Sequence, residues 1–443
     1  MATLPQTQLE LVPVDSEGRR WGILTRLGFR FVFLYFVLYC VTNQILPSLF
    51  PIPKLRIPTL AQSTQVRRAA TWTASHVFHL TSTLVYDRSG SGDKTYDFML
   101  SFLIAVVCVV AVVVWSVLDR KRPEYVTLWK WFCVFLRFNL GCQMLLYGFV
   151  KVVPLQMPYP QLTRLVEPYG NFSPMGVLWY SIGSAPAYEM FVGSAELLGG
   201  VLLFFPRTAF LGALVCLADT IEVFTLNMTY DVPVKLFSLH LLVMALILLG
   251  PELRRMWSFF FSDGAVDPPN RPALFRSARA NRIAVVVQAV YGLVLIGMGG
   301  YGSWQSLHSY GSLAPKSALY GIWNVNVLTI DGKSQPALVT EKSRVRRLIF
   351  ERPEGCAFQT MDDAFVNYGG KVDTSSHTVS LTRGNDKNWK ANFRFERSGS
   401  DHMTFDGEMD GRKYRMELEL LDRSKLMLVS RGFHWIQEYP FNR

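Results

Sequence analysis

Seven apolar stretches constrain this 443-residue chain more than any other feature. Each is close to the roughly 20 residues that an α-helix needs to cross about 30 Å of hydrocarbon. Because lipid offers no hydrogen bonds to the backbone, such a series predicts a polytopic α-helical membrane bundle of about seven spans. The predicted spans are Arg30–Leu49, Asp97–Leu118, Trp131–Val153, Ile182–Phe204, Arg207–Asn227, Pro233–Gly250 and Ile283–Tyr301.

Charged residues divide the chain into two parts. They make up about 14% of residues 1–316 but about 28% of residues 317–443, against roughly 25% in ordinary soluble domains. We therefore expect a water-soluble C-terminal domain after the membrane domain. The predicted boundaries are 1–29 for an N-terminal segment, 30–301 for the transmembrane domain, 302–316 for a linker and 317–443 for the C-terminal domain.

Basic residues beside the spans predict the orientation of the chain. With the N-terminus in the cytoplasm, 15 Lys and Arg residues lie on the cytoplasmic side and about eight on the other side, as the positive-inside rule requires. Seven spans then place the C-terminal domain outside. The net charge of +11 mostly reflects this pattern. No nucleic-acid partner is expected, because the C-terminal domain itself is nearly balanced.

The long 50–96 loop carries two local signals. Aromatic and aliphatic residues within Ala61–Val85 predict a helix that lies on the outer membrane surface. Arg88–Asp93 (Arg-Ser-Gly-Ser-Gly-Asp) is predicted to be a turn, and its glycines leave open a loop that cradles an anion.

The six cysteines include no C-x-x-C pair and no paired spacing. Zinc binding, a disulfide framework and c-type haem attachment therefore find no support. No metal site is expected elsewhere either.

Ionisable side chains inside the predicted spans are the candidate functional residues, because a charge in a spanning helix is costly and normally faces the protein interior. Counting about 1.5 Å of helix rise per residue from the outer span ends separates them by depth. The inner level predicts an ion pair between Arg137 and Glu196. The outer level is predicted to form a polar cavity open to the outside, built from Lys151, Glu189, Asp219, Glu222, Lys235 and His240.

Each of these residues receives a candidate role. The candidate catalytic, proton-transferring groups are Glu189, His240, Asp219 and Glu222, and the candidate substrate-binding groups are Lys151, Lys235 and Tyr147. A structural alternative stays open for all of them. Buried ion pairs fix the register of a bundle, and lysines near helix ends extend to the membrane interface. His240 taken alone is more typical of a packing histidine.

Two motifs carry a family resemblance. They are Tyr147-Gly148-Phe149-Val150-Lys151 and Glu196-Leu-Leu-Gly199-Gly200-Val-Leu-Leu, and through them residues 131–250 resemble the DoxX family of bacterial membrane proteins. The resemblance implies a four-helix membrane core, a bacterial inner (cytoplasmic) membrane, and a role near quinone-linked oxidation of small sulfur compounds or in membrane redox assemblies. It extends only to Gly148, Lys151, Glu196, Gly199 and Gly200. Three extra spans and the C-terminal domain depart from the family, so a different substrate or partner is open.

The C-terminal domain shows period-two alternation, the pattern of half-buried strands. Trp389, Ala391, Phe393 and Phe395 alternate with polar residues, and turn signals recur at Asp331-Gly332, Tyr368-Gly369-Gly370, Arg383–Asp386 and Asp410-Gly411. We expect eight to ten short strands in an all-β antiparallel meander or small barrel.

The start of this domain, Gly321-Ile322-Trp323, is similar to the G-x-W start of lipocalin-like barrels. In those barrels a late arginine packs over the tryptophan, and Arg431 is the candidate here. A barrel of this size either holds one small apolar ligand or is filled by side chains.

The leading hypothesis is a DoxX-like integral membrane protein that acts as a quinone-linked or redox-associated subunit. Its expected partners are the lipid bilayer, a quinone or small anion, and other membrane or extracytoplasmic redox proteins. Quinone is the one cofactor considered. The alternatives are a transporter or lipid-handling protein, and a non-catalytic scaffold whose outer β-domain binds partners.

Overall fold

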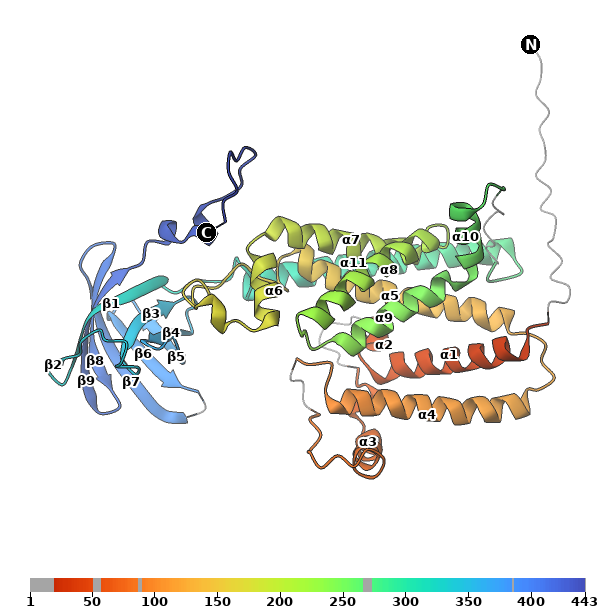
Figure 1. Cartoon of the computed structure of the whole chain (residues 1–443), viewed down its shortest axis with the longest axis horizontal. Coiled ribbons are helices and arrows are strands. Elements are labelled where there is room, and N and C mark those ends of the chain that lie inside the picture. The colour runs from red at the N-terminus through yellow and green to blue at the C-terminus, as the bar shows by residue number, and fades with distance from the viewer. Residues whose placement is uncertain (1–19, 51–56, 87–89, 266–272, 385, 443) are drawn as a thin grey trace, which may run out of the picture. The chain divides into compact units, whose positions relative to one another are not determined.

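The computed structural model describes residues 20–50, 57–86, 90–265, 273–384 and 386–442 (Figure 1). Within these ranges, seven helices are long and apolar enough to cross a membrane, and a closed β-barrel follows them. The predicted fold class is confirmed, and the chain is a multi-pass membrane protein with a C-terminal β-domain. Most of the predicted 1–29 segment lies outside the described residues.

The helices are α1 (Ile23–Thr42), α2 (Ile45–Ser48), α3 (Thr64–His76), α4 (Thr95–Leu118), α5 (Val126–Val152), α6 (Pro174–Gly183), α7 (Pro186–Phe204), α8 (Ala209–Thr229), α9 (Lys235–Leu249), α10 (Leu253–Phe261), α11 (Ala278–Ser309) and α12 (Met427–Ser430). The membrane-length segments are α1, α4, α5, α7, α8, α9 with α10, and α11.

Several predicted boundaries were wrong. The first span, predicted as Arg30–Leu49, is instead α1, which starts at Ile23 and ends at Thr42. The span predicted as Ile182–Phe204 starts four residues later, because α6 ends at Gly183 and α7 begins at Pro186. Proline favours the first turn of a helix, where its missing N–H costs nothing. The last helix continues to Ser309, so much of the predicted 302–316 linker is helical.

The chain divides into two compact units, in which α5, α7, α8 and α11 each contribute residues to both. The first comprises Met1–Gln143, Gly199–Thr220 and Pro233–Leu295, and the second comprises Met144–Leu198, Ile221–Val232 and Ile296–Arg443.

In the first unit, α1 and α4 lie side by side (Figure 1). Arg30, at which the first predicted span begins, is buried in α1. Its guanidinium donates to the hydroxyl of Tyr125 (2.5 and 2.9 Å) and to that of Ser116 (2.6 Å). These bonds offset the cost of removing the charge from water.

The strands are β1 (Gly321–Ile330), β2 (Lys333–Ser334), β3 (Val345–Phe350), β4 (Gly355–Thr360), β5 (Phe365–Asp373), β6 (Thr378–Arg383), β7 (Asp386–Arg397), β8 (His402–Met409) and β9 (Arg412–Leu420). All neighbours pair antiparallel, and β1 pairs with both β3 and β9. Eight strands therefore close a barrel, with the short β2 paired to the end of β1.

The barrel interior is filled by side chains. Ala391, Phe393 and Phe395 of β7 are buried as the alternation predicted, and Phe405 and Trp323 are at most 1% exposed. Asp331-Gly332 and Asp410-Gly411 form the predicted turns with positive φ angles. The turn predicted at Tyr368-Gly369-Gly370 was wrong, because both glycines lie within β5. A Cβ at Gly370 would lie 2.1 Å from the Ser380 carbonyl oxygen, so close strand approach requires glycine there.

Part of the barrel's outer face is also buried, within the second unit. Leu162, from the segment between α5 and α6, is 1% exposed and packs on Ile322, Ile349 and Ala357. These three residues neighbour the inward-facing Trp323, Phe350 and Phe358, so their side chains point outward. Gln359 also donates to the Val166 carbonyl (3.2 Å). The α5–α6 segment is therefore attached to the barrel.

Glu351, at the end of β3, reinforces this attachment. Its carboxylate accepts a hydrogen bond from the backbone N–H of Leu162, and burial raises the pKa of the Glu351 carboxyl.

Candidate functional site

The candidate site is built on a close crossing of α5 and α7. A Cβ added at Gly148 would lie 2.9 Å from the Gly193 carbonyl oxygen. One added at Gly193 would lie 2.6 Å from the Cβ of Lys151 and 2.7 Å from the Val152 nitrogen. Such contacts leave no room for a side chain, so glycine at both positions lets the helix backbones touch.

This crossing places Lys151 level with Glu196. Lys151 follows Gly148 by one turn on α5, and Glu196 follows Gly193 by one turn on α7. Their side chains form an ion pair in which Lys151 is 5% and Glu196 3% exposed. A buried pair of this kind is worth little over apolar packing, but removing one member leaves an unpaired charge.

The predicted Arg137–Glu196 pair was therefore wrong. Arg137 instead donates to the Leu203 carbonyl (2.8 Å) and to the Gln288 side chain (3.4 Å) in the first unit. The predicted depth of Glu196 was wrong because it was measured from Ile182 as the outer end of the helix. The helix in fact starts at Pro186, and the glycine crossing determines which residues are level.

Glu189 lies on the same helix, one turn into α7, and is 1% exposed. Its carboxylate accepts a hydrogen bond from the backbone N–H of Met157 (2.9 Å), in the segment that continues to Leu162 on the barrel. Lys151 also interacts with Glu189 through its charge. Glu222 of α8, which is half-buried, also interacts through its charge with Glu196, but as a like charge that repels it.

We name Lys151, Glu189, Glu196 and Glu222 the Lys151 cluster. It combines one ammonium group with three carboxyl groups. Among the described residues, the second carboxylate oxygens (Oε2) of Glu189 and Glu196 are buried and have no hydrogen-bond partner. Tyr147, one turn before Lys151 on α5, is half-buried. The cluster thus offers unsatisfied oxygen atoms that a proton or a bound molecule can engage.

His240, predicted in the same cavity, has its own partners in the first unit. Its Nδ1 lies 2.7 Å from the Leu236 carbonyl, which can only accept, so Nδ1 carries the hydrogen. The Tyr35 hydroxyl then donates to Nε2 (2.9 Å), and the ring stacks on Tyr39 at 3.7 Å between centroids. These contacts favour the alternative of a neutral packing histidine.

Lys235 is also engaged elsewhere. It forms an ion pair with Asp93 (3.8 Å), whose carboxylate accepts from the backbone N–H groups of Lys235 and Leu236 (both 2.9 Å). Asp93 thereby caps the start of α9. Asp219 is buried in the first unit, on α8. Arg88–Asp93 was predicted to be a turn, with an anion-cradling loop left open. Arg88 and Ser89 lie outside the described residues, and Asp93 at the other end caps α9.

The six residues predicted for one outer cavity are therefore distributed between the two units. Lys151, Glu189 and Glu222 belong to the Lys151 cluster, whereas Lys235 and His240 do not. Among the described residues, no group of three or more His, Cys, Asp or Glu side chains is arranged to hold a metal ion.

Sequence reasoning missed Gly193 and Asp93. Gly193 stands three residues before Glu196, as Gly148 stands three before Lys151, and this matched spacing could have revealed the crossing. Asp93 gave no comparable signal, because a cap on a helix distant in sequence depends on tertiary structure.

The arginine expected to cover Trp323 was also misassigned. Arg397 of β7 lies over that ring at 5.7 Å, and the Trp323 indole donates to the Leu319 carbonyl (2.9 Å). Arg431 instead lies over Phe441 at 3.9 Å. A basic residue thus lies over the tryptophan, but it comes from β7 and not from the C-terminal segment that carries Arg431.

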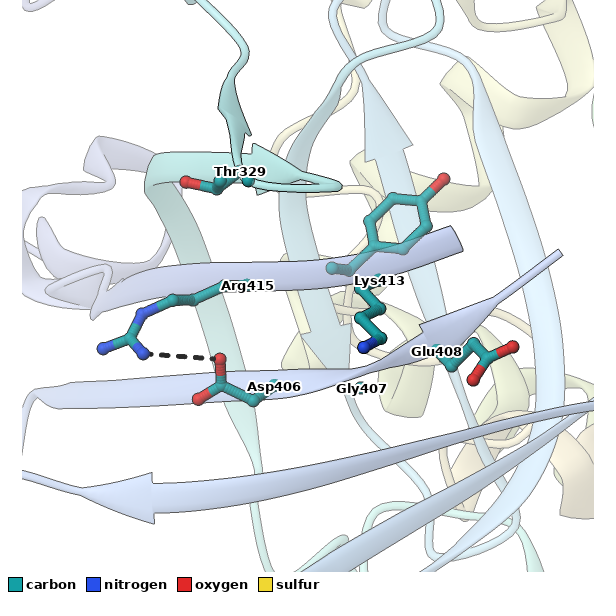
Figure 2. Close-up of a pocket in the computed structure, with 8 residues that line it drawn as sticks. Thr329, Asp406, Gly407, Glu408, Lys413 and Arg415 are labelled. Atoms are coloured by element: carbon teal, nitrogen blue, oxygen red, sulfur yellow. Dashed lines mark ion pairs between the residues drawn. The ribbon is translucent and has the colours of Figure 1, made fainter. Parts of the chain in front are cut away.

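Figure 2 shows a shallow hollow on the outer face of the barrel, between β8 and β9. Arg415 pairs there with Asp406 at 3.9 Å, beside Glu408 and Lys413. Both signs of charge are present and exposed, so the hollow favours no particular ligand charge. The sequence had not singled out these residues.

Comparisons with known proteins place the chain in a family. No family model and no solved structure matches it. Over 129 residues it is 34% identical to the uncharacterized protein YwoB of Bacillus subtilis (strain 168). The match covers 29% of this chain and 79% of YwoB. The chain therefore belongs to the same family as YwoB.

Proposed function

We propose that this chain is a DoxX-like, quinone-linked membrane redox subunit in which the Lys151 cluster binds a quinone headgroup and exchanges protons with it. The observation that carries the proposal is the buried Lys151–Glu196 ion pair with two further carboxyl groups beside it. YwoB is itself uncharacterized, so the proposal rests on the cluster and not on that relationship.

The charge of the cluster supports proton exchange. One ammonium group balances one carboxylate, and an unbalanced charge in a low-dielectric interior is very costly. We therefore expect Glu189, whose second carboxylate oxygen is buried without a hydrogen-bond partner among the described residues, to carry a proton for much of the time. A carboxylic acid held in this way can donate a proton to a molecule bound beside it and be reprotonated afterwards.

The position of the DoxX-like motifs supports the same site. Lys151 ends the first motif, Glu196 begins the second, and Gly148 of the first motif contacts Gly193 and Leu197 of α7. Gly199 is likewise close-packed, because a Cβ there would lie 2.9 Å from the Cys216 sulfur. The motif residues thus have two roles in the structure. The glycines allow close packing of helices, and Lys151 and Glu196 form the buried ion pair.

The proposed chemistry divides between this chain and a partner. Reduction of a quinone to a quinol consumes two electrons and two protons. We assign headgroup binding to Lys151, whose ammonium can donate to a quinone carbonyl oxygen. Both proton transfers are assigned to Glu189, which takes up a second proton from water between them. The electrons are assigned to a separate membrane or extracytoplasmic redox protein. In this proposal the chain lies in a bacterial inner membrane, with the N-terminus cytoplasmic and the barrel periplasmic.

Quinone binding by the purified full-length protein tests the proposal. In neutral detergent, calorimetric titration with a short-chain ubiquinone is expected to show saturable binding. Glu189→Gln and the paired change Lys151→Met with Glu196→Gln should each weaken it by about tenfold or more, the cost of losing one hydrogen bond to a charged group. Lys235→Met, outside the cluster, should leave it unchanged. Absence of binding, or equal binding by all variants, would contradict the proposal.

A non-catalytic scaffold is the second candidate, and the filled barrel favours it. An interior occupied by Trp323, Phe393 and Phe405 leaves the outer surface as the part that meets partners. The same observation speaks against the transporter or lipid-handling alternative in which the barrel carries a ligand. Under the scaffold hypothesis, the purified protein would bind no quinone and would retain a stoichiometric protein partner.

A further inference from the structure

A basic groove on α3 has no part in the proposed quinone site. It is a hollow of about 410 Å³ in the first unit, and it contains Arg67, Arg68, Thr71, Trp72, His76 and Tyr86. No acidic side chain is among the described residues that line it. Two guanidinium groups beside hydroxyl and aromatic side chains favour an anionic ligand.

The Arg67 guanidinium is positioned by its surroundings. It lies over the ring of Tyr86 at 5.2 Å, and the Tyr86 hydroxyl in turn shares a hydrogen bond with Thr71. Among the described residues, the buried Nε of Arg67 has no hydrogen-bond partner. A planar, pre-oriented guanidinium with a free donor is well suited to the oxygens of a phosphate group.

The packing of α3 places this groove beside the first turns of the membrane-length helix α4. Ala70 and Ala74 of α3 are buried against Tyr96 and Met99, which lie in the first turns of the membrane-length helix α4. The small alanines allow this close approach. Because α4 begins at Thr95, α3 lies beside the first turns of a helix that is long and apolar enough to cross a membrane.

Aromatic side chains on and after α3 also favour a position of the groove at the membrane interface. Phe78, just after α3, contacts the ring of Phe102 at 5.0 Å, two turns into α4. Trp72 is 57% exposed and stacks on His76. Exposed Trp and Phe side chains on an amphipathic helix are typical of segments that lie in the membrane interface.

We propose that this groove binds the phosphate group of an anionic phospholipid, with Arg67 and Arg68 as the phosphate-binding residues. A phosphate in solution has the same chemistry, but the position of the groove beside α4 and the apolar side chains near it favour a lipid. Bound lipid would attach the 50–96 loop to the membrane at the start of α4.

Native mass spectrometry of the delipidated full-length protein tests this proposal. The probes are phosphatidylglycerol, phosphatidylcholine and inorganic phosphate, each added at equal concentration in neutral detergent. Phosphatidylglycerol is expected to bind with an affinity about tenfold or more above that of the variant Arg67→Gln/Arg68→Gln, because two charge-assisted contacts are lost. The matched variant Arg394→Gln/Arg415→Gln removes two exposed barrel arginines and should bind like the wild type.

Because Arg67 packs on Tyr86, the single variant Arg68→Gln provides a test that leaves α3 intact. Its side chain is exposed, and about a threefold loss is expected from one exposed charge contact. Equal lipid binding by the wild type and both α3 variants would overturn the proposal. Displacement of phosphatidylglycerol by an equal concentration of inorganic phosphate, or equal affinity for phosphatidylcholine, would overturn the assignment to an anionic lipid.

Discussion

Replacing Lys151 with methionine is expected to lower the free energy of unfolding by about 3–5 kcal/mol, because it leaves Glu196 as an unpaired buried charge. Methionine keeps much of the length of the lysine side chain, so packing at the crossing changes little. Thermal unfolding of the full-length protein in detergent measures the loss. The loss should shrink at acid pH, because a protonated Glu196 needs no counter-charge.

Two matched variants test whether the unpaired charge of Glu196 causes the loss of stability. Adding Glu196→Gln to Lys151→Met removes both members of the pair and should restore most of the lost stability. Lys235→Met removes a partly exposed lysine at 3.8 Å from Asp93, and such pairs contribute about 1 kcal/mol or less. Equal stability of Lys151→Met and wild type would show that the ion pair is not buried as described. The same conclusion would follow if the double variant Lys151→Met/Glu196→Gln were less stable than either single variant.

The crossing itself is tested by Gly193→Ala. The added Cβ would lie 2.6 Å from the Lys151 Cβ and 2.8 Å from the Gly148 carbonyl oxygen. Neither atom is the flexible end of a side chain, so α5 and α7 must separate. Overpacking of this kind costs about 1–3 kcal/mol, and the same unfolding assay measures it.

Gly297→Ala in α11 is the control for the glycine change. A Cβ there meets nothing within 4 Å. It should therefore stabilise the helix by up to about 1 kcal/mol, the difference in helix propensity between the two residues. If Gly193→Ala proved as benign as Gly297→Ala, the two helices would not cross at this glycine.

Much of the fold was predictable because its signals are local. A run of about 20 apolar residues predicts a membrane span whatever the rest of the chain does. The alternation at Ala391, Phe393 and Phe395 likewise predicts one buried face of a strand. Asp331-Gly332 and Asp410-Gly411 predicted turns because both need positive φ angles, which Asp and Gly tolerate.

The pairing of charged groups was not predictable in the same way. The cost of a charge in a spanning helix correctly predicted that Lys151, Glu189 and Glu196 face the protein interior. The partner of each, however, depends on the height at which two helices cross. That height depends on Gly148 and Gly193 and on the start of α7 at Pro186. Arg397 over Trp323 and Asp93 at the start of α9 also arise from tertiary structure alone.

The central claim is that the Lys151 cluster holds protons inside the membrane and exchanges them with a bound quinone. Infrared difference spectroscopy of the full-length protein tests it most directly, by comparing quinone-free and quinone-bound samples at neutral pH in H₂O and D₂O. We predict a band of a protonated carboxyl group that shifts in D₂O, changes when quinone binds, and is lost in Glu189→Gln but kept in Lys235→Met. The account would be contradicted by an identical difference spectrum in Glu189→Gln, or by a wild-type spectrum without any protonated carboxyl band.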